Sequence, residues 1–145
     1  MAVIERRTGV PPRAWRLDAQ SVYRAHERAY RRAGTGALST VGATFQVSPR
    51  EIGKLFDVSR QAIGQWSQGG VPPSRLADVS RIADVALRLR RTFKRERIPA
   101  LVRRPNPGLD GHSVLQTLAE PNGVTRVMHA LDRLISYVPG PSATE

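Results

Sequence analysis

Apolar residues recur at helical spacing in two long stretches of the chain. In residues 74–94, the positions Ile82, Val85, Leu89 and Phe93 follow a period close to 3.6 residues, which predicts a long amphipathic helix with one buried side. A second helix is predicted between Pro121 and the Pro139-Gly140-Pro141 stop. No strand-like alternation of useful length occurs, so the pattern predicts an all-α fold. The apolar face of the second helix consists of Val124, Val127, Met128, Leu131, Leu134, Ile135 and Val138.

Two short helices are predicted in close succession between residues 48 and 68. Ser48 is followed by a proline and, three residues after itself, by Glu51, which is the pattern of a capping box at a helix start. Ser59 is the expected N-cap of the second helix, and Gly69-Gly70 is its expected end.

Weaker signals complete the chain on either side. Asp18 is a plausible N-cap for a helix that runs to about Ala33 and stops at Gly34, with residues 35–47 as a connector of small residues. Ser113 is expected to cap a short helix through Ala119, after a loop at residues 105–108. The predicted organisation is a flexible basic arm (1–17), a helix-turn-helix domain (18–73), a connecting helix (74–95), a small helical C-terminal domain (96–139) and a tail (140–145).

The segment from Ser48 to Gln68 has the features of a helix-turn-helix, the two-helix motif that places its second helix in the DNA major groove. Gly53 leaves space where the helices approach closely, and Val58 is expected to fill the turn. Asp57 stands where many such motifs have glycine, so a slightly different turn is expected. The expected inward residues are Ile52, Leu55, Phe56, Ile63 and Trp66.

The outer face of the second helix suits the recognition of bases. Arginine and glutamine form paired hydrogen bonds with guanine and adenine edges, respectively, and no acidic residue shares this face. Ser59, at the helix N-terminus, suits a phosphate, and Gly64 allows the helix backbone to lie deep in the groove. The predicted base-reading residues are Arg60, Gln61, Gln65 and Gln68.

The charge of the chain supports a polyanionic partner. The net charge is +11, from 23 basic against 12 acidic residues, and every basic residue except Lys54 and Lys94 is arginine. Codon bias explains a preference for arginine over lysine, but it does not explain the excess of positive charge. Together with the helix-turn-helix, the charge favours double-stranded DNA.

A basic stripe is predicted along the long helix, where Arg81, Arg88, Arg91 and Arg95 are separated by seven, three and four residues. The alternative is a solvated helix face, but residues 88–104 contain eight basic residues and a single acid, which favours phosphate contacts. The N-terminal arm either enters an adjacent minor groove or has no ordered role. The predicted phosphate-contacting residues are Ser59, Arg50, Lys54, Arg81, Arg88, Arg91, Arg95, Arg103 and Arg104, and those of the arm are Arg6, Arg7 and Arg13.

The C-terminal stretch RRPNPGLDGHSVLQTLAEPNGVTRVMHALDRL resembles the toxin-binding domain of antitoxins of the Xre/MbcA/ParS type. The motif is the loop at residues 105–111, which is followed by a short and then a final helix. This resemblance implies a protein that represses its own promoter and neutralises an NAD-consuming toxin.

The arrangement is also similar to the small, arginine-rich immunity repressors of temperate mycobacterial phages, which implies binding to operator-like sites. The basic arm and the arginine-rich first helix favour the phage type, because they add charge that toxin neutralisation does not require. The tail after Val138 favours it too, because it is rich in Pro, Gly and Ser and has no obvious plug for a toxin pocket. Both resemblances imply a transcriptional repressor that binds DNA, and we expect it to act by occluding the operator.

Other functions have little support in the sequence. There is no cysteine, and His26, His112 and His129 lack the spacing of a metal site. Gly34-Thr-Gly36 is no nucleotide-binding fingerprint, and a nuclease-like carboxylate cluster is absent. We therefore expect no enzyme activity, cofactor, metal or small-molecule substrate. No apolar run approaches about 18 residues, so we expect a cytoplasmic protein without a membrane partner. A second copy of the chain and a toxin protein both remain open as protein partners.

Overall fold

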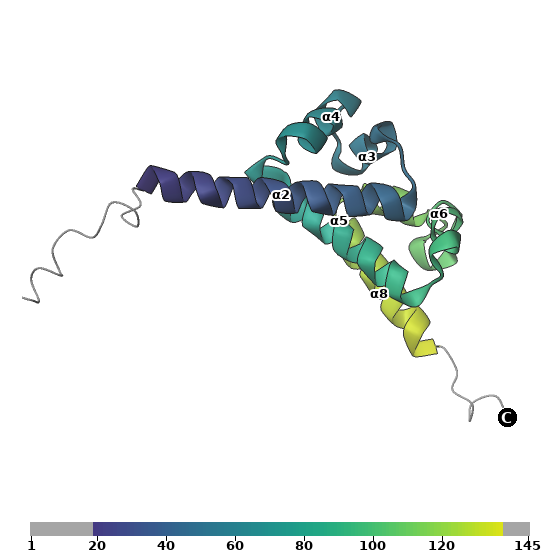
Figure 1. The fold of residues 1–145 in the computed structure, drawn as a ribbon. Helices are drawn as coiled ribbons and strands as arrows, with labels where there is room; N and C mark the ends of the chain where they lie inside the picture. The colour runs from purple at the N-terminus through teal and green to yellow at the C-terminus, as the bar shows by residue number, and fades with distance from the viewer. Residues whose placement is uncertain (1–18, 138–145) are drawn as a thin grey trace, which may run out of the picture.

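A computed structural model describes residues 19–137, and within them the secondary structure is entirely helical (Figure 1), which confirms the predicted all-α fold. Figure 1 shows α3 and α4 on one side of α2, with α8 on the other. The α-helices are α2 (Ala19–Phe45), α3 (Pro49–Phe56), α4 (Arg60–Gly69), α5 (Pro73–Thr92), α6 (Ile98–Leu101), α7 (Val114–Leu118) and α8 (Gly123–Tyr137), and the short 3-10 helices are η2 (Arg95–Arg97) and η3 (Pro107–Leu109).

Helix α2 is longer than predicted, because Gly34 does not end it and residues 35–45 are helical rather than a connector. A Cβ atom at Gly34 would lie 2.9 Å from the Cβ of Val71 and 2.9 Å from the Cδ1 of Leu76. The glycine is thus a packing position, at which α2 approaches the connection between α4 and α5. The predicted cap Asp18 lies outside the described residues.

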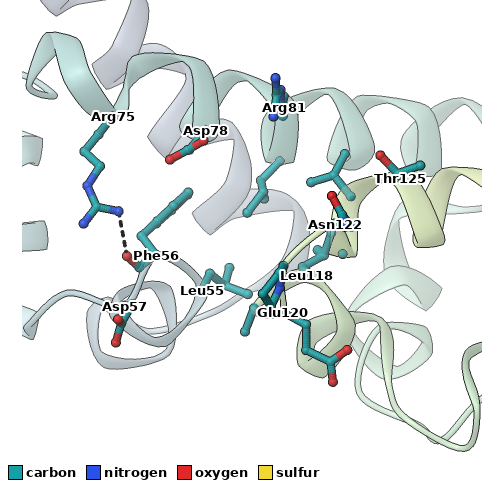
Figure 2. A pocket seen from close by; sticks show the side chains of 15 residues that line it. Leu55, Phe56, Asp57, Arg75, Asp78, Arg81, Leu118, Glu120, Asn122 and Thr125 are labelled. Atoms are coloured by element: carbon teal, nitrogen blue, oxygen red, sulfur yellow. Dashed lines mark hydrogen bonds between the residues drawn. The ribbon is translucent and has the colours of Figure 1, made fainter.

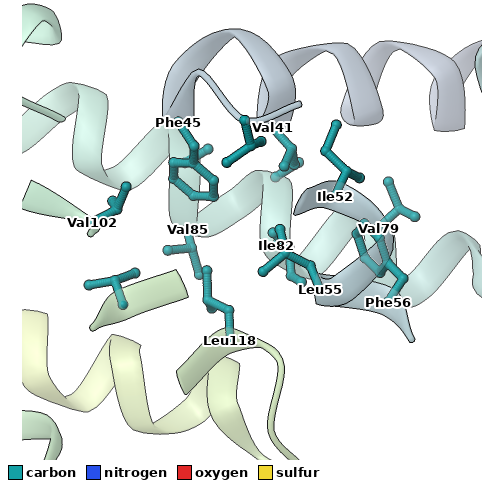
Figure 3. Close-up of a cluster of buried hydrophobic side chains, with 14 of the residues drawn as sticks. Val41, Phe45, Ile52, Leu55, Phe56, Val79, Ile82, Val85, Val102 and Leu118 are labelled. Atoms are coloured by element: carbon teal, nitrogen blue, oxygen red, sulfur yellow. The ribbon is translucent and has the colours of Figure 1, made fainter. Parts of the chain in front are cut away.

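The core forms where α2 packs along α5 and both meet α3 (Figure 3). Val41 and Phe45 of α2 are fully buried, as are Val79 and Val85 of α5. The apolar stripe predicted for α5 is confirmed, with Ile82, Val85 and Leu89 buried and Phe93 half-buried just after the helix end.

The same cluster of buried side chains continues into the C-terminal helices. Ile98, Val102, Leu118 and Val127 belong to it together with the residues of α2 and α5. The helix-turn-helix domain (18–73) and the C-terminal domain (96–139) predicted from the sequence therefore do not have separate cores. Whether they act as separate functional domains stays a prediction.

The C-terminal helices follow their local signals closely. Ser113 caps α7 with a full capping box formed with Gln116, as the serine predicted. On the predicted apolar face of α8, Val127 and Leu131 are buried, whereas Leu134 is 47% exposed near the end of the helix. The side chains of residues 135–138 lie outside the description. None of the helices within residues 19–137 combines the length and apolar character that crossing a membrane requires.

Candidate nucleic-acid interface

The start of α3 is fixed by the predicted capping box. The Ser48 hydroxyl oxygen accepts the Glu51 N–H at 3.2 Å, and the Glu51 carboxylate accepts the Ser48 N–H at 2.9 Å. The hydrogen bond from the Ser48 backbone lowers the pKa of Glu51, and the nearby Arg103 guanidinium lowers it further.

This capping box predicts a loss of stability in acid. A lowered carboxylate pKa in the folded state contributes stability that is present above the unfolded-state pKa and is lost as the pH falls through the folded one. Glu51→Gln keeps the acceptor for the Ser48 N–H but has no titratable group. We expect its thermal unfolding temperature to fall less steeply with acidification than that of the parent, and equal acid slopes would contradict this.

The geometry of the turn between α3 and α4 explains the presence of Asp57 in the turn and of Gly53 in α3. Asp57 has φ 55° and ψ 48°, the left-handed conformation that glycine favours and that aspartate tolerates. Asp57 thus adopts at this turn a conformation that glycine usually supplies, and a slightly different turn stays a prediction. A Cβ on Gly53 would lie 2.6 Å from the carbonyl oxygen of Val58, so the glycine lets the backbone of the turn approach α3.

Helix α4 packs against the rest of the fold through two large buried side chains. Ser59 caps it by accepting the Ala62 N–H at 3.1 Å. Ile63 is 1% and Trp66 6% exposed, and the Trp66 ring lies with its centroid 5.9 Å from that of Phe56. The predicted inward residues of both helices are therefore confirmed.

The opposite side of α4 is open to solvent. All four predicted base-reading side chains, those of Arg60, Gln61, Gln65 and Gln68, are exposed. No acidic residue occurs within α4, and a Cβ on Gly64 would meet no atom within 4 Å. The helix thus presents amide and guanidinium groups, with no carboxylate of its own to repel a phosphate backbone.

The predicted phosphate contacts are spread over several parts of the molecule. Ser59, Arg50 and Lys54 are exposed on the helix-turn-helix itself. Arg81 lies further along α5, at an open cleft of about 640 Å³ between the turn and the start of α8 (Figure 2).

The other exposed members lie at the far end of α5. Arg91 is in its last turn, about 27 Å from the start of the helix at 1.5 Å per residue. Arg95 belongs to η2 rather than to α5, so it does not continue the predicted helical stripe. Arg104 follows in the bend after α6. These three arginines are on a different part of the molecule from α4.

Two members of the predicted phosphate set are held by partners within the chain. Arg88 is half-buried, forms an ion pair with Asp132 of α8, and lies 3.8 Å from the sulfur of Met128. Arg103 donates to the backbone carbonyl oxygens of Phe45 and Gln46 at 2.9 and 2.7 Å. Both arginines therefore have structural contacts within the chain, and their phosphate contacts stay predictions.

Arg103 supplies the positive charge that α2 lacks in its own last turn. Its guanidinium also lies 3.5 Å from Glu51, so one side chain joins α2, α3 and α6. We expect Arg103→Ala to lower the free energy of unfolding by about 1–3 kcal/mol, since the carbonyl groups of Phe45 and Gln46 lose a charged donor. In a salt titration of DNA binding below the melting temperature, the slope of log Kobs against log salt concentration should equal that of the parent. A reduced slope without loss of stability would instead support the predicted phosphate contact of Arg103.

Arg75 is a residue that the sequence reasoning missed. Its guanidinium donates to the Phe56 carbonyl oxygen at 3.0 Å and so joins α5 to the end of α3 (Figure 2). No sequence signal marks this contact, because its partners are separated by 19 positions. The predicted arm residues Arg6, Arg7 and Arg13 lie outside the described residues.

Comparison of the chain with models of known protein families and with curated proteins gave no match.

Proposed function

We propose that the chain is a sequence-specific double-stranded DNA-binding protein that represses transcription by occluding its operator, as an immunity repressor of the phage type does. The observation that carries this proposal is the construction of α4. One side is anchored by Ile63 and Trp66, and the other exposes three glutamines and an arginine with no acid. Such a rigid helix with paired hydrogen-bonding side chains is what the major groove accepts.

The proposal is tested first on the DNA upstream of the gene that encodes the chain. Footprinting locates the site, and fluorescence anisotropy then compares that duplex with a random duplex of equal length and at the same salt concentration. We expect a preference of at least about 1,000-fold for the operator. Equal affinity for both duplexes would overturn the proposal.

The base-reading assignment predicts a loss of specificity. Arg60→Ala and Gln65→Ala should each weaken operator binding by about 1–3 kcal/mol and relax selectivity at a single base pair, while binding to random DNA changes little. Arg90→Ala removes an exposed arginine outside the proposed interface and serves as the control. A uniform loss on every sequence would contradict a base-reading role.

Gly64 offers a sharper test, because stability and binding should change in opposite directions. A Cβ there meets nothing within the chain, so Gly64→Ala should stabilise the helix by up to about 1 kcal/mol. If α4 lies deep in a groove, the added methyl group must displace DNA contacts, and we expect operator affinity to fall at least tenfold.

Gly36→Ala is the matched control, since Gly36 is also an interior helix glycine with no atom within 4 Å of a Cβ. We expect it to raise the melting temperature and leave operator affinity unchanged. If Gly64→Ala also leaves the affinity unchanged, α4 does not enter a groove with this face.

A further inference from the structure

The first half of α2 extends beyond the other helices (Figure 1). Every side chain described from residue 19 to residue 33 is exposed, with the exception of the half-buried Glu27. Nothing in the core explains this extension, which spans about 21 Å at 1.5 Å per residue. A segment of this length is marginal as an isolated helix in water, so its exposed surface is a candidate binding surface.

The extension is strongly and asymmetrically charged. It contains four arginines and one acid, Glu27, whose carboxylate is paired with Arg31. Arg24, Arg28 and Arg32 are exposed and form no ion pair with any residue from 19 to 137. They follow one another at intervals of four, along a single ridge of the helix. We call these three residues the arginine ridge.

The ridge begins on the side of α2 that carries the helix-turn-helix. A Cβ on Gly70, the C-cap of α4, would lie 2.7 Å from the Cβ of Arg31, and a Cβ on Gly42 would lie 3.6 Å from the Cδ1 of Ile52 in α3. Arg24 and Gly42 are separated by 18 residues, or about five full turns, and therefore share one face. The α2 surface on which α3 and α4 rest thus continues along the extension to Arg24, and the ridge turns by about 40° around the helix with each step from Arg24 to Arg28 and Arg32.

We propose that the arginine ridge binds DNA phosphates that flank the base pairs contacted by α4. This inference rests on the proposed DNA binding by α4 and adds a second contact to the same duplex. The chemistry fits, because guanidinium groups bind phosphate oxygens through forked hydrogen bonds. The ridge spans about 12 Å, and a duplex carries one charge per about 1.7 Å of its axis, so several phosphates fall within reach.

The test replaces the whole ridge in the full chain, as R24A/R28A/R32A. These side chains make no described contact in the fold, so we expect the melting temperature and helix content to stay unchanged. Each lost phosphate contact reduces the slope of log Kobs against log salt by about 0.9, so the slope should become shallower by about 2.7. The affinities for the operator and for random duplexes should fall by the same factor, because phosphates carry no sequence information.

Two matched variants isolate the cause. R24K/R28K/R32K keeps the charge and should retain most of the parent's salt slope. R90A/R97A removes exposed arginines elsewhere and should leave the part of the salt slope that comes from the ridge unchanged. Hydroxyl-radical footprinting should show protected backbone at a flank of the operator that disappears only in the alanine variant. This links the lost contacts to the bound duplex itself.

The outcomes separate the two proposals. If the parent does not prefer the operator over random DNA, the proposed function fails whatever the ridge does. If the parent is specific but the alanine variant keeps its slope and flanking protection, the ridge proposal alone is overturned. The ridge proposal is also overturned if the alanine variant loses affinity for the operator only, since that result indicates contacts to bases rather than to phosphates.

Discussion

Trp66→Ala should lower the free energy of unfolding by about 3–5 kcal/mol, the range for truncating a buried aromatic side chain. Trp66 is 6% exposed and packs against Phe56, so its loss removes a large contact that orients α4 on α3. We expect operator binding to be abolished at temperatures where the variant is still folded, because the base-reading side chains no longer keep a fixed position. Chemical denaturation measures the first effect, and anisotropy with operator DNA measures the second.

Leu87→Ala is the control for this experiment. Leu87 is 40% exposed on α5, so the same kind of truncation there removes little buried surface and should change stability by less than about 1 kcal/mol. If Trp66→Ala were as stable as this control, the packing described for α4 would be wrong. If it were destabilised yet bound the operator normally, α4 would not be the element that recognises DNA.

Local signals in the sequence were sufficient to predict most helix starts. Ser48, Ser59 and Ser113 each cap the helix that the sequence assigns to them, because a cap involves atoms only three residues apart. The inward and outward residues of α4 were predictable for a similar reason, since the helical period alone separates Trp66 from Gln65. The outer surface of the candidate interface therefore follows from the sequence.

The errors have a common physical cause, which is a partner that is distant in the sequence. Gly34 resembles a helix stop until Val71 and Leu76 pack against it. The contact of the Arg103 guanidinium with the end of α2 was not predicted either, because its partner lies 58 positions earlier. Once α2 was predicted to stop at residue 33, its arginines had no defined position relative to α4, so the arginine ridge was not visible.

Gly123→Ala should have the largest effect of any small substitution in the C-terminal part. A Cβ at this position would lie 1.8 Å from the carbonyl oxygen of Thr117 and 3.1 Å from the Cα of Leu118, so no side-chain rotation relieves the clash. The start of α8 must move away from α7, and we expect a loss of stability above the upper end of the overpacking range of about 1–3 kcal/mol.

This substitution also tests how far the core is shared, because Leu118 and Val127 belong to the same buried cluster as Val41 and Val85. A shared core predicts that Gly123→Ala melts in a single transition and loses operator binding, although the site of the change is not on α4. Calorimetry and anisotropy at matched temperatures measure both. A two-step melt, with α4 still binding the operator after the first step, would show instead that the helix-turn-helix part folds without the C-terminal helices.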